Sequence, residues 1–298
     1  MVSVTTFAIM HLAPGGPSVL ADPKLSAAER AAIVEQLGLD APLPVQFTRW
    51  ITRAARGDLG TSFLYAAPTA QAIADRVPNT LVLAGAALLL ACLIGVPTGI
   101  AAGAAPGGTL DRWALRASVA GIAVPVFWLG IMLILVFAVR LQWLPAGGIT
   151  ADVDGGGLVD RARHLILPAS TLALASASEL FRYTRAAVRE GRDANWWRVA
   201  RARGVPRRRL LWRHAARHAL VTLCSVLSVQ LPRLVGGAAI TETVFSWPGM
   251  GRLGVEAALA RDYPLVMGVT LVVTLGVVLA GVLSDLGQLA ADPRLRRA

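Results

Sequence analysis

The sequence predicts an all-α membrane protein, a polytopic bundle of helices that cross a lipid bilayer. Hydrophobic residues make up 55% of the 298-residue chain and charged residues only 16%, whereas soluble domains carry about 25% charged residues. Three stretches, 77–110, 117–139 and 263–284, contain no charged residue. Each exceeds the roughly 20 apolar residues that cross a hydrocarbon core about 30 Å thick. Helices are the predicted structure because they satisfy their own backbone hydrogen bonds where water is absent.

The chain begins with an apolar segment, residues 1–13, that is about half as long as a span. This segment lacks the basic region and the small-residue cleavage site of a signal peptide, and we interpret it as a partial first transmembrane helix. Residues 14–76 form a polar segment in which six acidic residues balance six basic ones. A transmembrane domain is predicted to follow over 77–288, and residues 289–298 form a tail.

The transmembrane domain contains five predicted spans. They lie at about 79–104, 117–139, 164–184, 219–241 and 263–284. The third of them is weaker, because its uncharged part ends at residue 178, and we expect the helix to continue beyond it. The fourth is apolar apart from Gln230 and one charged residue, Arg233.

The net charge of +11 is concentrated in one part of the chain. Residues 165–217 carry twelve arginines against three acidic residues, whereas the segments 14–76 and 140–164 are neutral. Basic loops remain in the cytoplasm. We therefore predict a multi-pass protein of the bacterial plasma (inner) membrane, with a cytoplasmic loop over 190–218 and a cytoplasmic C-terminus. Residues 14–76 are predicted to be extracytoplasmic.

The basic loop is also compatible with nucleic-acid binding. It includes the run RARGVPRRRLLWRH. A short loop between two spanning helices offers little surface to a duplex, and the membrane topology alone accounts for its charge. We expect no nucleic-acid partner.

Sequence motifs for catalysis or cofactor binding are absent or lack the neighbouring residues that they need. Gly249, Gly251 and Gly254 match G-x-G-x-x-G, but FSWP precedes them where a dinucleotide site needs a strand. An ATP-binding P-loop requires a lysine after its glycines, and the only lysine of the chain, Lys24, follows Pro23. H-E-x-x-H and G-x-S-x-G are absent. We therefore expect no enzyme, no catalytic residue and no cofactor.

Metal binding also lacks support in the sequence. His214 and His218 lie four residues apart and could share a helix face, but a metal site needs further ligands. Cys92 and Cys224 both fall inside predicted spans and have no paired spacing. We expect the two histidines to be solvated or interfacial and the two cysteines to be packing residues that face lipid or the core.

The cytoplasmic loop is the part of the chain with the most specific pattern. It begins as a short helix from Asn195 and breaks near Gly204, because glycine permits a positive φ and Pro206 disfavours helix at the preceding residue. A second amphipathic stretch then leads to the next span. The small residues Ala200 and Ala202 allow a partner to approach closely.

This loop resembles the EAA loop of ABC-importer permeases, whose short helix docks on the ATPase subunit. The three positions of the motif read Arg198, Val199 and Ala200, followed by the family glycine, Gly204. Only the last alanine of the triad is retained. Arginine at the first position is similar to the dipeptide/oligopeptide/nickel branch of the family.

Further blocks along nearly the whole chain resemble the same branch. They are HLAPGGP (11–17), GDLGTS (57–62), RVPNTL (76–81), PVFWLG (125–130), LQWLPAGG (141–148), HLILPASTLAL (164–174), ETVFSWPGMGRL (242–253), RDYPLV (261–266) and DPRLR (292–296). The usual acidic residue of the first block is replaced by Gly16. The resemblance implies a polytopic bundle of the type I ABC-importer permease kind with about six spans, the first truncated here.

The resemblance also implies partners. Such a permease pairs with a second homologous permease subunit and with two cytoplasmic P-loop ATPase subunits. An extracytoplasmic substrate-binding protein delivers the cargo, which in this branch is a di- or oligopeptide, a nickel chelate, glutathione or another small solute. A stand-alone channel or ion-coupled transporter is the other class considered, but such proteins carry acidic or histidine relays within their spans, and the spans 79–104, 117–139 and 263–284 have none.

Arg233 has two interpretations. A charge near the middle of a span costs about 2.5–3.5 kcal/mol and is a functional-site hypothesis by default. Arg233 could line the translocation pathway and attract a substrate carboxylate. Alternatively, it pairs with Glu242 or Glu179, or lies nearer the membrane boundary.

Overall fold

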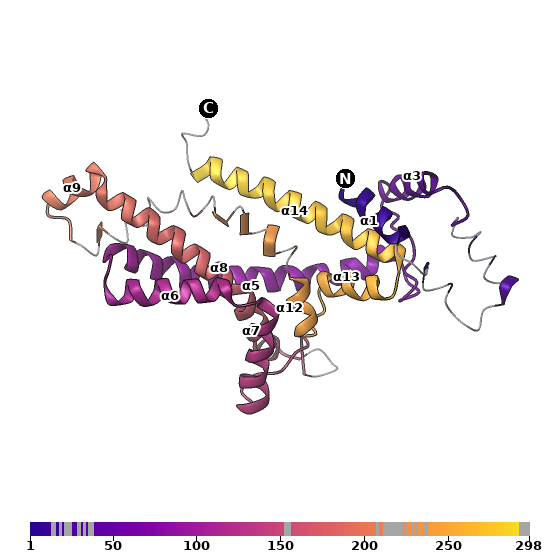
Figure 1. Ribbon diagram of the computed structural model, residues 1–298, viewed down its shortest axis with the longest axis horizontal. Coiled ribbons are helices and arrows are strands. Elements are labelled where there is room, and N and C mark those ends of the chain that lie inside the picture. The colour runs from indigo at the N-terminus through magenta and orange to yellow at the C-terminus, as the bar shows by residue number, and fades with distance from the viewer. Residues whose placement is uncertain are drawn as a thin grey trace. The chain divides into compact units, whose positions relative to one another are not determined.

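The structure is a computed structural model, and most of the residues that it describes form helices (Figure 1). It describes residues 1–12, 16–17, 20, 26–28, 31, 34, 39–151, 156–206, 209–210, 223, 226–227, 229–230, 232–234, 236 and 238–291. Within these ranges the β structure is limited to one isolated bridge between Thr61 and Pro68. The predicted all-α class is therefore confirmed for this part of the chain.

The structure describes the following helices, in order from the N-terminus to the C-terminus. They are α1 (Val2–Leu12), α3 (Leu43–Ala54), α4 (Thr69–Ala74), α5 (Val77–Ala104), α6 (Thr109–Ala123), α7 (Val126–Leu133), the π-helix η2 (Ile134–Arg140), α8 (Leu158–Asp193), α9 (Asn195–Ala202), α12 (Ala239–Val244), α13 (Met250–Leu259) and α14 (Tyr263–Ala291).

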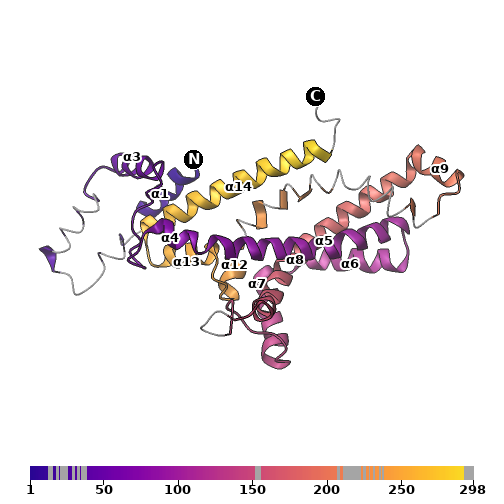
Figure 2. The same cartoon turned by 180° about the vertical axis from the view of Figure 1, so that it is seen from behind.

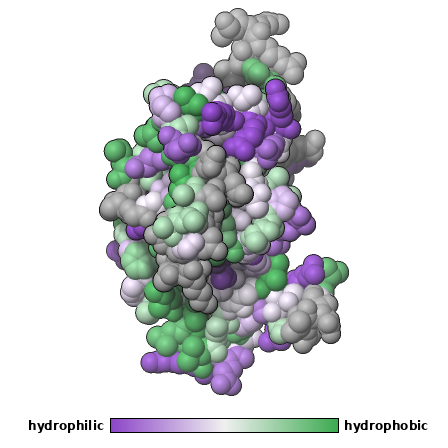
Figure 3. Space-filling model, turned by 90° about the vertical axis from the view of Figure 1, so that its right-hand side faces the viewer, coloured by the Kyte–Doolittle hydropathy of each residue, from purple (hydrophilic) through white to green (hydrophobic). Residues whose placement is uncertain are grey.

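Among the described residues, three helical stretches are long and apolar enough to cross a membrane. They are Thr69–Ala104, Leu158–Arg192 and Tyr263–Gly287. Their large apolar side chains are in part exposed, as expected for lipid contact, and Figure 3 shows hydrophobic side chains open to the surface on the face that it presents. The predicted spans 79–104, 164–184 and 263–284 lie within α5, α8 and α14, and their membrane boundaries stay predictions.

The segment predicted as one span at 117–139 contains a sharp break. α6 and the following α7–η2 stretch are bent by 103° relative to each other. Val124 is extended, with a ψ of 124°, and Pro125 precedes α7. Proline lacks an N–H donor and disfavours helix at the residue before it, which explains the break. Ten of the 23 residues of the predicted span 219–241 lie outside the described residues, as do 292–298 of the predicted tail.

The chain divides into two compact units. The terminal unit comprises Met1–Thr80 and Pro248–Leu275, and the central unit comprises Leu81–Trp247 and Gly276–Ala298.

The terminal unit is built around a small hydrophobic core. Its buried residues come from α4, α13 and the first half of α14; they are Ile73, Met250, Leu253, Ala257, Leu265 and Val269. At the edge of the unit the Tyr263 hydroxyl donates to the Met10 carbonyl at 3.1 Å. This bond ties α1 to the start of α14.

A buried carboxylate, Asp262, joins distant parts of the terminal unit. It accepts hydrogen bonds from the Ser62 hydroxyl at 2.5 Å, the Leu64 amide at 3.0 Å and the Leu265 amide at 3.1 Å. The bond to Leu265 caps the N-terminus of α14, where a carboxylate also meets the positive end of the helix dipole. Asp262 is fully buried, so its three donors compensate its desolvation.

A second set of bonds joins the start of α5 to the start of α13. The Asn79 amide donates to the Pro248 carbonyl at 2.8 Å, and the Met250 amide donates to the Thr80 hydroxyl at 2.8 Å. Nearby, the Tyr65 hydroxyl donates to Glu256 at 3.0 Å, and burial together with this carboxylate raises the pKa of Tyr65.

We predict that Asp262→Ala lowers the free energy of unfolding by about 1.5–3 kcal/mol, because hydrogen bonds to a charged acceptor are lost. Thermal unfolding of the purified protein in detergent measures the effect, and proteolysis of the 57–68 loop reports its release. The matched control is Asp75→Ala, since Asp75 is exposed at the end of α4. Equal unfolding temperatures for the two variants would contradict a bracing role for Asp262.

Candidate functional site

The central unit depends on an unusually close approach of α5 and α8. Gly95, Gly99 and Gly103 recur every four residues and form a glycine stripe on α5. A Cβ atom added at Gly95 would lie 2.5 Å from the carbonyl oxygen of Ala177, and one at Gly99 would lie 2.7 Å from the Cβ of Thr184. Only glycine permits this contact, which is the small-xxx-small arrangement of membrane helices. Figures 1 and 2 both show α5 alongside α8.

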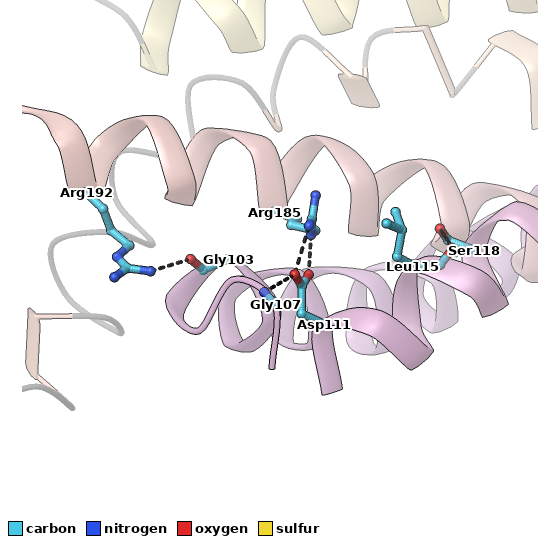
Figure 4. Close-up of polar contacts among 7 residues, drawn as sticks. All are labelled: Gly103, Gly107, Asp111, Leu115, Ser118, Arg185 and Arg192. Carbon is cyan, nitrogen blue, oxygen red and sulfur yellow. Dashed lines mark hydrogen bonds and ion pairs between the residues drawn. The ribbon is translucent and has the colours of Figure 1, made fainter. Parts of the chain in front are cut away.

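α6 packs against α8 in a similar way. At Gly121 an added Cβ would lie 2.4 Å from the Ser178 hydroxyl. Further along, Arg185 of α8 makes a two-pronged ion pair with the buried Asp111 of α6, through Nε to Oδ1 and through Nη2 to Oδ2 at 2.9 Å (Figure 4). Such bidentate pairs fix geometry as well as charge.

The same ion pair reaches the connection between α5 and α6. Oδ2 of Asp111 also accepts the Gly107 amide at 2.8 Å. About two turns beyond Arg185, the Arg192 guanidinium donates to the Gly103 carbonyl at 3.4 Å (Figure 4). The last turns of α8 are therefore held to both α5 and α6.

α9 follows α8 after the extended residue Ala194. One side of this helix is anchored, because Trp197 is buried in a cluster with Ile100, Ala187, Val188 and Leu210. Trp196 packs edge-on against Trp197, with ring centroids 5.6 Å apart. The short α9 is thus attached to the ends of α5 and α8 by a large aromatic side chain.

The predicted motif residues divide between the two sides of α9. Arg198 and Val199 are exposed, and the Arg198 guanidinium donates to the Asn195 side chain at 2.6 Å. Ala200 is half-buried and packs against the Trp197 cluster, and Ala202 is exposed. The expectation that these small residues allow a partner to approach closely stays a prediction.

Gly204 ends the helix as the sequence indicates. Its φ is +73°, and no atom lies within 4 Å of the position that a Cβ would take. It is exposed, and the Gly204 amide donates to the Arg201 carbonyl at 3.0 Å. Part of the predicted 190–218 loop lies outside the described residues. This part comprises residues 207–208 and 211–218 and includes His214 and His218.

Arg233 lies against Glu179 of α8. Its Nη1 atom is 3.2 Å from Glu179 Oε1, and the two side chains are 63% and 30% exposed. The Gln230 amide also donates to Glu179, and the Ser176 hydroxyl donates to Gln230 at 3.3 Å. Of the two carboxylates considered, the structure pairs Arg233 with Glu179; Glu242 is fully buried in α12.

These residues border an open groove of about 830 Å³ in the central unit. We call it the arginine groove. It is lined by Leu115, Ile122, Glu179, Arg182, Tyr183, Arg185, Ala186, Val226, Val229 and Arg233. Among the described residues, no three histidine, cysteine or acidic side chains are grouped as metal ligands. The groove combines apolar walls with arginines and a carboxylate, which suits an amphipathic organic solute.

Two family models match the chain. The model described as "Binding-protein-dependent transport system inner membrane component" covers residues 95–297, and the N-terminal model of such membrane components covers residues 1–84. The chain belongs to this family. It is therefore a multi-pass inner-membrane transport component, and the resemblance noted in the sequence is confirmed.

Individual relatives cover the whole chain. The oligopeptide transport system permease protein AppB of Bacillus subtilis is 36% identical over 296 residues, which are 99% of this chain and 94% of AppB. The glutathione transport system permease protein GsiC of Salmonella paratyphi A is also 36% identical, over 297 residues and with the same coverage.

A solved structure shares the fold. The chain is similar to one from the inward-facing MetNI methionine ABC transporter, with a TM-score of 0.60 and 18% identity, over 74% of this chain and 96% of that one. The predicted type I ABC-importer permease fold is confirmed by this likeness and by the family.

Several residues of the site were not identified from the sequence. The G-x-x-x-G-x-x-x-G spacing of the glycine stripe is a local signal that could have been recognised. The pairing of Asp111 with Arg185 joins residues 74 positions apart, and no local pattern indicates it.

We predict that Gly99→Ala destabilises the protein, whereas Gly85→Ala in the same helix does not. A Cβ at Gly99 would lie 2.8 Å from the Phe181 carbonyl oxygen, but nothing lies within 4 Å of one at Gly85. Overpacking of this kind costs about 1–3 kcal/mol, while alanine otherwise favours helix over glycine. Thermal unfolding in detergent compares the two, and equal stability would contradict the close α5–α8 contact.

Proposed function

We propose that this chain is the transmembrane permease subunit of an ATP-binding-cassette importer for di- or oligopeptides. The single observation that carries the proposal is α9, a short helix anchored on one side by Trp197 and exposed on the other at Arg198 and Val199. A helix held in this way can transmit a push from a partner to α5 and α8. The family supplies the context in which such a partner exists.

The partner at α9 is proposed to be one of two cytoplasmic P-loop ATPase subunits. The chain does not hydrolyse ATP itself, because its only lysine, Lys24, does not follow a glycine-rich loop. The excess of arginine around α9 supports a cytoplasmic location for this helix and for the C-terminus, by the positive-inside rule. A second homologous permease subunit completes the pathway.

The terminal unit is proposed to meet an extracytoplasmic substrate-binding protein. Its 57–68 loop is held in a defined conformation by Asp262 and by the Tyr65–Glu256 bond. Leu64 and Tyr65 nevertheless remain partly exposed on this loop. A rigid loop with exposed apolar and aromatic groups is suited to protein contact.

Peptides are the proposed cargo. AppB carries an oligopeptide name and GsiC a glutathione name at the same 36% identity. Glutathione is itself a small modified peptide, so both names indicate the same chemical class. Nickel chelates and other small solutes are the alternatives within the branch.

The test is reconstitution of the permease with its partner subunits, followed by ATP-driven uptake of radiolabelled peptide. Gly204→Asp should abolish uptake and weaken co-purification of the ATPases, yet leave membrane insertion intact. Aspartate tolerates a positive φ better than most residues, and space around Gly204 is open, so the defect would arise at the partner contact.

The matched control is Gly57→Asp, because Gly57 has a φ of +86° and equally open surroundings in the terminal unit. This variant should retain the ATPase subunits on co-purification. Normal ATPase binding and normal substrate-stimulated hydrolysis with Gly204→Asp would count against the proposal, and so would peptide uptake driven by a proton gradient without ATP.

A further inference from the structure

The arginine groove contains three arginines whose electrostatic surroundings differ. Arg185 is paired with Asp111, and Arg233 is paired with Glu179. Arg182 lies three residues after Glu179 on α8, where its side chain is exposed. In the part of the chain that the structure describes, no carboxylate forms an ion pair with Arg182.

Two buried side chains hold the Glu179 carboxylate in place. Gln230 is 4% exposed and Ser176 is 5% exposed, and together they form a buried chain of hydrogen bonds that ends on the Glu179 carboxylate. The Glu179 carboxylate therefore accepts hydrogen bonds from both Arg233 and Gln230, and its position does not depend on Arg182. Among the described residues, the positive charge of Arg182 has no ion-pair partner in the groove.

The position of Arg182 indicates which kind of ligand suits the groove. Residue 182 lies near the end of the predicted span 164–184, and an arginine within a span is expensive unless it faces water or a polar partner. The walls of the groove also include Leu115, Ile122, Val226 and Val229. An open groove with apolar walls and an exposed arginine is suited to an organic anion.

We propose that Arg182 binds the C-terminal carboxylate of a peptide in transit through the groove. The planar guanidinium matches a carboxylate with two parallel hydrogen bonds. The apolar walls receive the peptide side chains, and the Glu179–Arg233 pair borders the site. The inference rests on the proposed function as a peptide permease, and it transfers the anion-binding role considered for Arg233 to Arg182.

The experiment measures uptake of radiolabelled trialanine and of its C-terminal amide by the complete transporter in proteoliposomes. The wild-type protein is compared with Arg182→Gln and with Arg182→Lys, which keeps the charge but not the planar fork. Arg112→Gln serves as the matched control, since Arg112 is an exposed arginine of α6 that does not line the groove. The binding protein is the same in every arm, so its own preference for the acid cancels.

Arg182→Gln should reduce trialanine uptake by about tenfold through the loss of a charge-assisted bond, with little change for the amide. Arg182→Lys should retain part of the activity, and Arg112→Gln should behave as wild type. If the wild-type complex takes up trialanine and Arg182→Gln leaves that uptake unchanged, the role of Arg182 is wrong while the proposed function stands. If the wild-type complex takes up neither peptide, both are wrong.

A phospholipid phosphate offers the same chemistry to Arg182. The assays are therefore repeated in vesicles of phosphatidylcholine alone and of phosphatidylcholine with one part in three of phosphatidylglycerol. A defect that is equal for acid and amide and that appears only with phosphatidylglycerol would assign Arg182 to a lipid headgroup and overturn the proposal. A defect confined to the acid in both lipids supports it.

Discussion

The close contact between α5 and α8 along the glycine stripe is the constraint on which the central unit depends. Membrane helices gain little from hydrophobic association in lipid, so they rely on close packing and interhelical hydrogen bonds. The three glycines allow backbone contact, and this brings the polar groups of α6 and α8 within reach of one another. The Asp111–Arg185 pair and the Arg192–Gly103 bond then complete the contact (Figure 4).

This arrangement connects two functional surfaces through one helix. α8 carries Glu179 and Arg182 in the arginine groove, and its last turns support α9 through the Trp197 cluster. A displacement of α9 therefore acts on a helix that also forms a wall of the groove. In the account proposed above, ATP binding by the partners moves α9, and α8 transmits that movement to the solute pathway.

Local patterns predicted the elements better than their contacts. Uncharged runs located α5 and α14, and the Gly204–Pro206 pair marked the end of α9, because backbone preferences are local. Pro125 was visible in the sequence and accounts for the break, but the 103° angle between α6 and the α7–η2 stretch was not predicted from it.

Tertiary contacts were beyond the reach of those patterns. The family blocks GDLGTS and RDYPLV prove to be partners, since Ser62 of one donates to Asp262 of the other across 200 positions. The blocks RVPNTL and ETVFSWPGMGRL are likewise joined by the hydrogen bond from the Asn79 amide to the Pro248 carbonyl. For Arg233, the sequence left Glu179 and Glu242 as alternatives, and only the packing of α8 distinguishes them.

The central claim is that the exposed side of α9 is the attachment point for the ATPase subunits. Cross-linking tests it most directly, with single cysteines placed in a variant in which Cys92 and Cys224 are replaced by alanine. Val199→Cys, at a position that is 50% exposed, should cross-link to an ATPase subunit, whereas Ala187→Cys, at a position of the Trp197 cluster that is 5% exposed, should not. Cross-linking from neither position, or equally from both, would contradict the account.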